Sequence, residues 1–334
     1  MTTLLIVLIV LAIGFAFLNG VHDSSNLVST MISSRAIQPQ VALVLAAIAE
    51  FSGPFVFGVA VANTIGHEIV SSQHLNMMII IAALLSAIIW NLVTWLLGIP
   101  SSSSHALIGG LIGAVAIGVG FHEIQIAGVV KVIVYLFVSP LVGFIAGMII
   151  ANIVYLLSWK ASPRINGVFR KLQIVTSLGL AMGSGANDAQ KTMGMITLGL
   201  IIAGLQKDFT VPFWVIFSCA LAIALGVALS GYRLIRTLGA KFYKIRPVHG
   251  FSSQLASAIV ILTASLLGGP VSATQVVSTA IMGVGAAERV SKVRWGVAGE
   301  IAFAWLFTIP VTALLAAGVY WVIQFGIPAI VQLF

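Results

Sequence analysis

The amino-acid sequence predicts an all-α polytopic membrane protein built as an inverted repeat, and three observations lead to this expectation. Of the 334 residues, 60% are hydrophobic and only 7% are charged, whereas soluble domains contain roughly 25% charged residues. Stretches such as 75–97 and 213–231 are long enough to cross the hydrocarbon core of a bilayer as helices. A polar stretch at residues 19–26 recurs at residues 183–191, which indicates two related halves.

The apolar segments should all be helices. Backbone groups in lipid must satisfy their own hydrogen bonds, and the chain lacks the short alternating pattern of barrel strands. The polar stretches should break the first and the sixth helix. Ten crossings are expected, at about residues 4–36, 40–62, 75–98, 105–120, 126–157, 172–204, 212–232, 250–268, 275–286 and 296–325.

The basic residues predict the orientation of the chain. Thirteen of the sixteen Lys and Arg residues fall in alternate connections: Arg35, Lys160, Arg164, Arg170, Lys171, Arg233, Arg236, Lys241, Lys244, Arg246, Arg289, Lys292 and Arg294. By the positive-inside rule these connections are cytoplasmic. Both termini are therefore expected on the extracytoplasmic side of the membrane.

The repeat has three landmarks in the same order, and the last is Pro140 with Pro310 at an offset of 170 residues. Asp23 aligns with Asp188 at an offset of 165 residues, and the Pro-Ser element at 98–105 aligns with 268–275 at an offset of 170. Each half would contain five crossings, and an odd number makes the second half insert upside down. Inverted repeats are typical of secondary transporters, which bind their substrate near the midplane where the repeats meet.

The predicted boundaries follow from this alignment. The first repeat is expected at 1–158, a cytoplasmic linker at 159–171 and the second repeat at 172–334.

Four of the eight acidic residues lie inside apolar segments: Asp23, Glu50, Asp188 and Glu300. A charge at a helix centre costs about 2.5 to 3.5 kcal/mol on insertion scales, so an acid there is a functional candidate. Glu300 lies close to the basic cluster at Arg294 and is expected to pair there. For Glu50 two interpretations stand equally, a coupling acid or the partner of a buried cation.

The two aspartates have matching neighbours. Each lies near glycine and a carboxamide, Asn26 beside Asp23 and Asn187 beside Asp188. Carboxylate, carboxamide and the free carbonyls of a broken helix form an all-oxygen site for a hard cation, and we expect Na⁺ at Asp23, Asn26 and Asp188. Free N–H groups at the same break would bind an anion. The alternative is that each Asp only caps the following helix.

The two Pro-Ser elements are predicted to be re-entrant segments or helix starts. Their hydroxyls and bare N–H groups suit an oxyanion, although plain capping is the alternative. His105 would lie opposite Gln275, and His105 is either a proton carrier or a hydrogen-bonded core residue.

The symmetry fails at one position that bears on ion coupling. The offset of 165 aligns Lys191 with Asn26. In one interpretation, the ammonium of Lys191 fills the position in the second half that corresponds to the cation site of the first half. In the second interpretation, Lys191 snorkels toward the membrane surface and neutralises Asp188.

Four motif copies resemble the signatures of the inorganic phosphate transporter (PiT) family, bacterial branch. Residues 185–188 read Gly-Ala-Asn-Asp, and 20–23 read Gly-Val-His-Asp with histidine in place of the first asparagine. Residues 100–105 are similar to the family element Pro-x-Ser-Thr-Thr-His, and 270–275 match it with two departures. The resemblance covers nearly the whole chain.

The resemblance implies a symporter of inorganic phosphate, not an enzyme, in the lipid bilayer of the cell inner membrane. Phosphate, alone or as a metal complex, would move with Na⁺ or H⁺ by alternating access, with no other cofactor and no nucleic acid. A homodimer and a PhoU-like cytoplasmic partner are also implied. The expected substrate-binding residues are Asp23, Asn26, Ser102, Ser103, Ser104, Asn187, Asp188, Lys191, Thr192, Ser272 and Thr274, and the expected ion-coupling residues are Asp23, Asn26, Asp188, Glu50, His105 and Gln275.

Two departures from the family favour fewer bound Na⁺ ions or H⁺ coupling. Lys191 adds a positive charge, and Gln254 stands where the family has an acid. A sulfate or other oxyanion permease is the close alternative function. An anion channel is remote, because the polar residues gather at repeat-related positions and do not form a continuous pore lining.

Overall fold

The computed structural model describes residues 2–34, 36–70, 75–99, 101–162, 164–230, 246–293 and 295–326. Within them, all regular structure is helical apart from one isolated β-bridge between Val70 and Ile124. The basic residues Arg35, Arg233, Arg236, Lys241, Lys244 and Arg294 lie outside the described residues, as does Pro100.

The helices follow the expected order along the chain. The first half contains α1 (Thr2–Ser33), α2 (Pro39–Phe57), α3 (Ala60–Asn63) with the π-helical turn η1 (Thr64–Glu68), α4 (Met77–Leu97), α5 (Ser103–Gly118), the short turn η2 (Phe121–Glu123) and α6 (Ile126–Leu157). The second half contains α7 (Ile165–Ile202), α8 (Phe213–Leu229), α10 (Pro247–Leu266), α11 (Ala273–Glu288), the short turn η3 (Val290–Lys292), α12 (Trp295–Trp321) and η4 (Val322–Gly326).

Most of these helices have membrane-spanning character. In the part of the chain that the structure describes, α1, α2, α4, α6, α10 and α12 with its final turn are long and apolar enough to cross a membrane. The apolar helices α5 and α8 are shorter. Helix α5 has 16 residues and α11 has 16, so each is about 24 Å long. That is less than the roughly 30 Å of a hydrocarbon core.

The predicted breaks in the first and sixth helices are wrong. Helix α1 runs without interruption through 19–26, and α7 runs through 183–191. The glycines there allow close packing: a Cβ on Gly20 would overlap the carbonyl of Ile223 on α8, and one on Gly185 would overlap the backbone of α2. Glycine in these helices therefore makes room for a neighbouring helix and does not bend its own.

The break that the structure does show lies in the second predicted crossing. Helix α2 contains Pro54 and ends at Gly58, whose φ of 78° suits glycine and few other residues. The chain restarts as α3 and continues as the π-helical turn η1. The stretch predicted as one helix at 40–62 is thus two helices with a bend between them.

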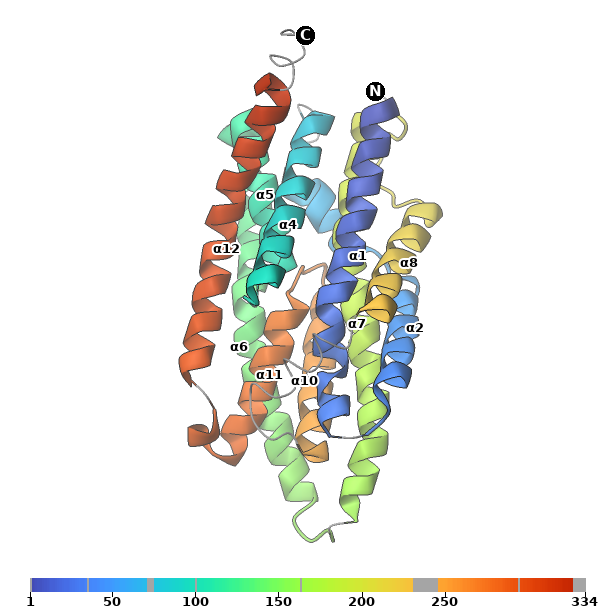
Figure 1. Ribbon diagram of the computed structural model, residues 1–334, viewed down its shortest axis with the longest axis vertical. Coiled ribbons are helices and arrows are strands. Elements are labelled where there is room, and N and C mark those ends of the chain that lie inside the picture. Colours follow the sequence, from blue (N-terminus) through green and yellow to red (C-terminus); the bar gives the residue numbers. More distant parts are fainter. Residues whose placement is uncertain are drawn as a thin grey trace.

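Two helical hairpins enter the molecule from opposite ends. Figure 1 shows the α4–α5 hairpin in the upper part and the α10–α11 hairpin in the lower part. Each turn begins with a glycine of positive φ, Gly98 (69°) and Gly268 (72°). The turns meet, since the Ser104 hydroxyl donates to the carbonyl of Val271 over 3.0 Å. This contact brings the two Pro-Ser elements together inside the protein.

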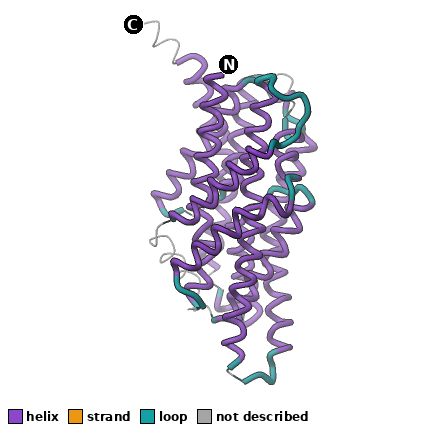
Figure 2. Tube along the Cα trace, turned by 90° about the vertical axis from the view of Figure 1, so that its right-hand side faces the viewer, coloured by secondary structure: helices purple, strands orange, loops and turns teal. Residues whose placement is uncertain are grey.

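The helices run side by side along the long axis of the molecule (Figure 2), and helices of the two halves pack on one another. Helix α2 packs on α7 and α8 on α1, while α11 packs on α6 and α5 on α12. Each hairpin thus rests on a long helix, and each half covers the other.

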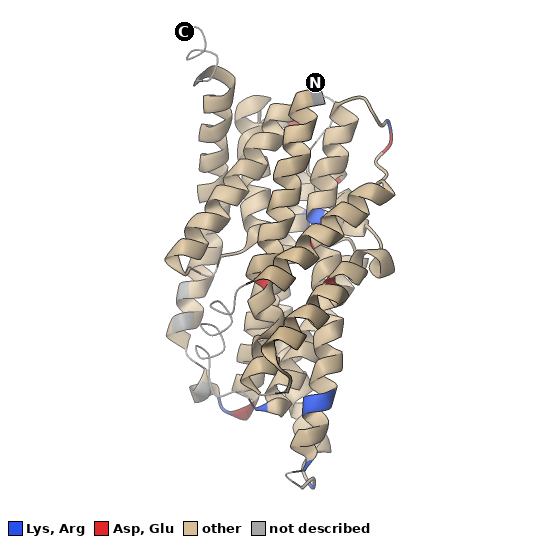
Figure 3. Cartoon of the chain, turned by 45° about the vertical axis from the view of Figure 1, so that its right-hand side comes forward, with Lys and Arg blue, Asp and Glu red and all other residues tan. Residues whose placement is uncertain are grey.

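Basic side chains gather at one end. Figure 3 shows them mainly at the end formed by the α6–α7 connection, the start of α10 and the end of α11, called the basic end below. The start of α1 and the end of α12 lie at the opposite end (Figure 1).

Candidate functional site

The first polar cluster joins α1 to the tip of the α10–α11 hairpin. Asp23 and Asn26 lie one turn apart on α1 and are buried. The Asn26 amide donates to Asp23 Oδ1 over 3.3 Å and to the Thr274 hydroxyl over 2.9 Å. Thr274 in turn donates to the same carboxylate oxygen over 3.1 Å. A carboxylate, a carboxamide and a hydroxyl therefore form a closed triangle.

The second polar cluster joins α7 to the tips of both hairpins. The ammonium of Lys191 donates to Asp188 Oδ1, to the Ser104 hydroxyl at 2.6 Å and to the Val271 carbonyl at 2.7 Å. Asp188 Oδ2 accepts from the Ser184 hydroxyl over 3.0 Å. Lys191 is only 1% exposed, so the prediction of a snorkelling lysine is wrong, although the pairing with Asp188 that it assumed is present.

The two clusters have the same design. In each, a carboxylate lies three residues before a hydrogen-bond donor on a long helix, and a hydroxyl comes from a hairpin tip. They differ at one group, because the donor is a neutral carboxamide at Asn26 and an ammonium at Lys191. The three residues expected to bind Na⁺ are divided between them, Asp23 and Asn26 in the first and Asp188 in the second.

His105 and Gln275 meet where the hairpin tips touch. The Gln275 amide nitrogen lies 3.5 Å from each ring nitrogen of His105, and Nδ1 of His105 lies 2.8 Å from the Ser102 hydroxyl. Ser102 accepts from the backbone N–H of His105, and Ser272 accepts from that of Gln275. The capping interpretation is thus confirmed for these two serines, and their oxygens are already engaged by the helix starts.

Asn187 has a structural role that its place in the motif did not predict. Its amide donates to the Ser265 hydroxyl (2.9 Å) and the Gly269 carbonyl (3.1 Å), and its oxygen accepts the N–H of Val271 (3.1 Å). These bonds fasten the tip of the α10–α11 hairpin to α7. Asn187 points to the tip and holds the Val271 carbonyl in front of Lys191.

Glu50 lies on α2, fully buried beside the two clusters. Neither of its oxygens has a hydrogen-bond partner within the described residues, because the nearby Ser184 hydroxyl donates to Asp188. Glu50 interacts electrostatically with both Asp23 and Asp188. Three carboxylates therefore share one ammonium, and the fully ionised site would carry two net negative charges.

Two of the residues expected to bind substrate, Thr192 and Ser103, make no side-chain hydrogen bond to the described residues. The Thr192 hydroxyl follows Lys191 on α7, is buried, and has no hydrogen-bond partner in the described part of the chain. Ser103 begins α5 and is half-buried. The side chain of Glu300 lies outside the described part of the structure. Among the residues described, no group of three or more His, Cys, Asp or Glu side chains could hold a metal ion.

Gln190 is a residue of the site that the sequence did not reveal. Its side-chain oxygen accepts the N–H of Val61 over 2.7 Å and that of Ala62 over 3.3 Å. These N–H groups are left without a helical partner by the break at Gly58. The signal in the sequence was Gly58. A helix break there means that the first N–H groups of α3 need a hydrogen-bond acceptor from elsewhere in the protein.

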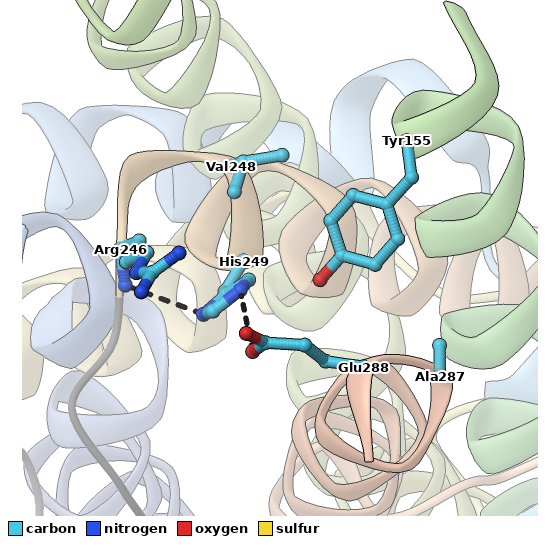
Figure 4. A pocket seen from close by; sticks show the side chains of 6 residues that line it. All are labelled: Tyr155, Arg246, Val248, His249, Ala287 and Glu288. Carbon is cyan, nitrogen blue, oxygen red and sulfur yellow. Dashed lines mark hydrogen bonds and ion pairs between the residues drawn. The ribbon is translucent and has the colours of Figure 1, made fainter. Parts of the chain in front are cut away.

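A separate cavity of about 270 Å³ lies between the end of α6, the start of α10 and the end of α11, at the basic end (Figure 4). Tyr155, Arg246, His249 and Glu288 line it, and the His249 imidazole lies 3.3 Å from the Glu288 carboxylate. None of the predicted site residues lines this cavity.

The chain is similar to known transporters over almost its whole length. A model of the phosphate transporter family matches residues 19–316. The chain is 45% identical to a "Probable low-affinity inorganic phosphate transporter" of Rhizobium meliloti (strain 1021), over 95% of this chain and 96% of the relative. It is 42% identical to a protein of the same description from Bacillus subtilis (strain 168), over 96% and 97%.

A solved structure described as "The sodium-dependent phosphate transporter" has the same fold. It superposes with a TM-score of 0.89, at 26% identity over 96% of this chain and 99% of that one. The motifs, the apolar helices and these likenesses agree, and the chain belongs to the phosphate transporter family.

Proposed function

We propose that this protein is a secondary active symporter that moves inorganic phosphate together with a cation, Na⁺ or H⁺, by alternating access. One observation carries the proposal: two buried clusters of the same design meet between the tips of two opposed hairpins. The similar proteins named as inorganic phosphate transporters, and the sodium-dependent neighbour, support the choice of substrate and of a cation-coupled mechanism.

The proposed architecture is an inverted repeat of 1–158 and 172–334 joined by a linker at 159–171. Each half would contribute three crossings and one re-entrant hairpin, so the total is six crossings and not ten. In the first half these are α1, the broken helix α2–α3–η1, and α6. In the second they are α7, α8 and α12. Three is odd, so the halves still insert in opposite orientations.

The charge of the site explains why a cation must accompany phosphate. Two net negative charges would repel an anion, and buried charges are stable only when they are paired. Cations or protons bound at Asp23 and Glu50 would remove this repulsion. The oxygen atoms of Asp23, Asn26 and Thr274 suit Na⁺. Glu50, whose oxygens are buried and accept no hydrogen bond from the described residues, suits a proton.

Phosphate would bind to donors on the hairpin tips and on α7. We assign the hydroxyls of Ser103, Ser104, Thr192 and Thr274 to its oxygens, together with the Lys191 ammonium. Thr192 is the strongest candidate of the hydroxyls because its oxygen is buried without a protein partner.

Lys191 would take the place of one coupling ion. Its ammonium is surrounded by a carboxylate, a hydroxyl and a carbonyl, which are the ligand types of a hard cation. Only the Asn26 half of the site would then need a mobile cation. The protein would then bind fewer cations per phosphate than a transporter that has a carboxamide at both corresponding positions.

Phosphate uptake into proteoliposomes tests the proposal. With radiolabelled phosphate outside, an imposed Na⁺ or pH gradient should drive saturable uptake, and the effective gradient identifies the coupling ion. Uptake that ignores both gradients would contradict symport. Inhibition by sulfate as strong as that by unlabelled phosphate would favour the sulfate permease. The homodimer and the PhoU-like partner remain proposals from the family resemblance alone.

A further inference from the structure

A buried polar seam leads from the site toward the basic end between α1, α7 and α10. Its six residues are Thr30 on α1, Ser34 in the turn directly after α1, Gln173 and Ser177 on α7, and Ser252 and Gln254 on α10. All are buried, and Gln173 and Ser252 are 0% exposed. The inference drawn from this seam rests on the proposed function.

The seam residues lie on the same faces of α1 and α7 as the aspartates of the two polar clusters. On α1, Asp23 and Thr30 share one face because they are seven residues apart. Ser34 lies one turn beyond Thr30, in the turn after α1, where its N–H donates to the Thr30 carbonyl. On α7, Ser177 lies eleven residues before Asp188, which is three helical turns and the same face. Gln173 is at the far end of the seam, two residues beyond Lys171 in the basic end.

Side-chain hydrogen bonds close the seam. The Gln254 amide donates to the Thr30 hydroxyl over 2.7 Å and accepts from the Thr176 hydroxyl over 3.0 Å. Ser34 donates to the Gln173 oxygen over 2.7 Å. Three helices are thus held together by polar contacts that water could replace.

Two polar atoms in the seam are left without partners. The amide nitrogen of Gln173 and the hydroxyl of Ser252 are buried, and neither has a hydrogen-bond partner within the described residues. Such atoms lower the stability of a closed protein. Their presence is explained if the seam is hydrated in another conformation.

The repeat offers an internal comparison. The offsets of 165 and 170 residues relate the six seam residues to Met195, Gly199, Leu8, Ala12, Ala82 and Leu84. None of these has a side-chain oxygen or nitrogen. Most of them are members of one buried apolar cluster.

The two sets occupy equivalent places in the fold. Leu8 packs against Gly199, 3.0 Å from where a Cβ would stand, and this pair corresponds to the hydrogen-bonded pair of Gln173 and Ser34. Helix α4 packs mainly on α1 and touches α7, and its counterpart α10 packs mainly on α7 and touches α1. At these six pairs of positions, the contact is polar toward the basic end and apolar toward the opposite end.

We propose that the polar seam is the route by which phosphate, a hydrated oxyanion, and its cation pass between the site and the basic end. A hydrated ion needs polar walls, because an apolar wall offers no replacement for its water. A seam that stayed closed could be apolar, as its counterpart is. The basic side chains at its mouth would attract the anion. The apolar counterpart remains dry when the basic end is open.

Cysteine labelling tests this route directly. The single cysteine, Cys219, is buried on α8 and is first replaced by Ser. Into this background we place S177C and T30C and, as repeat-related controls, A12C and M195C. The protein is reconstituted in lipid nanodiscs, where both ends are accessible, and treated with a charged methanethiosulfonate reagent with and without inorganic phosphate.

The seam cysteines should react roughly tenfold faster than their repeat-related controls, because a thiol reacts only where the reagent and water reach it. Saturating phosphate should change the rates of S177C and T30C and leave those of A12C and M195C unchanged. Equal rates within each pair, or no reaction at any of the four positions, would overturn the proposal.

A transport measurement gives a second test that does not depend on the folding of the cysteine variants. Gln254→Leu makes the seam apolar and should lower maximal uptake roughly tenfold at an unchanged KM for phosphate, and Gln254→Asn should restore part of it. Leu84→Met at the equivalent position is the control. Unchanged uptake in Gln254→Leu would count against the route. If the wild type transports no phosphate but the labelling contrast persists, the proposed function fails and the hydrated seam stands.

Discussion

At the scale of single residues, the chemistry of the site depends on one substitution between its halves. Asn26 and Lys191 make corresponding contacts, each to a carboxylate three residues earlier and to a hydroxyl on a hairpin tip. A carboxamide brings no charge of its own, so its carboxylate remains available to a cation or a proton, whereas an ammonium neutralises its carboxylate. Ion coupling is therefore expected mainly at Asp23.

Replacing Asp23 by Asn should abolish coupled phosphate uptake while membrane insertion is retained. The substitution keeps the size of the side chain and its hydrogen bonds to Asn26 and Thr274 but removes the charge that holds the cation. Uptake in proteoliposomes measures the effect. Asp208→Asn, at an exposed acid in the α7–α8 connection, is the control. Wild-type uptake by Asp23→Asn would refute the assignment.

Two substitutions of Lys191 separate its roles. Lys191→Ala should abolish or strongly weaken uptake, because Asp188 is left buried and unpaired. Lys191→Asn restores the chemistry of the other half, and its uptake should depend more steeply on cation concentration. Initial uptake rates across a cation series measure both variants, with the exposed Lys207→Asn as control. Normal kinetics in Lys191→Ala would end the idea of a built-in cation.

At the scale of helices, close packing replaces the predicted breaks. Gly53 of α2 lies against the backbone of α7 near Met182, and Gly185 of α7 lies against that of α2 at Glu50. This reciprocal contact presses Glu50 against the helix that carries Asp188. The carboxylates are near one another because glycine allows the two helices to approach.

Enlarging Gly185 should weaken this contact. In Gly185→Ala the new methyl group would overlap backbone atoms of Glu50, and overpacking of this kind costs about 1 to 3 kcal/mol. Thermal unfolding in detergent should show a lower midpoint. Gly179→Ala on the same helix meets nothing within 4 Å and should keep or slightly raise the midpoint. Equal effects of the two substitutions would mean that the contact is not tight.

At the scale of the whole molecule, charge defines two different ends. The basic end holds the α6–α7 connection, and the opposite end holds the α7–α8 connection and the start of α1. The positive-inside rule predicts that the basic end faces the cytoplasm. The polar seam would then open toward the cytoplasm.

Labelling in intact cells tests this orientation. In a Cys219→Ser background, T210C in the α7–α8 connection should react with an impermeant maleimide added outside. S162C in the α6–α7 connection should react only after the membrane is permeabilised. Both positions are exposed, so the reagent can reach each once it is on the correct side. The reverse pattern would invert the proposed topology.

The sequence by itself determined the class of protein, the approximate place of most helices and the residues of the two polar clusters. These properties depend on hydropathy along the chain and on fixed offsets between motifs, which a one-dimensional pattern contains. The alignment of Asn26 with Lys191 was also readable, and the structure places the two in corresponding contacts.

Only the tertiary structure decided what the polar and small residues do. Whether glycine breaks a helix or admits a neighbour depends on what packs against it, so the breaks at 19–26 and 183–191 were wrong and Gly58 was missed. Asn187 proved to hold one hairpin tip, and Lys191 to be buried against Ser104 on the other. Such outcomes depend on contacts between segments more than eighty residues apart, which no local pattern contains.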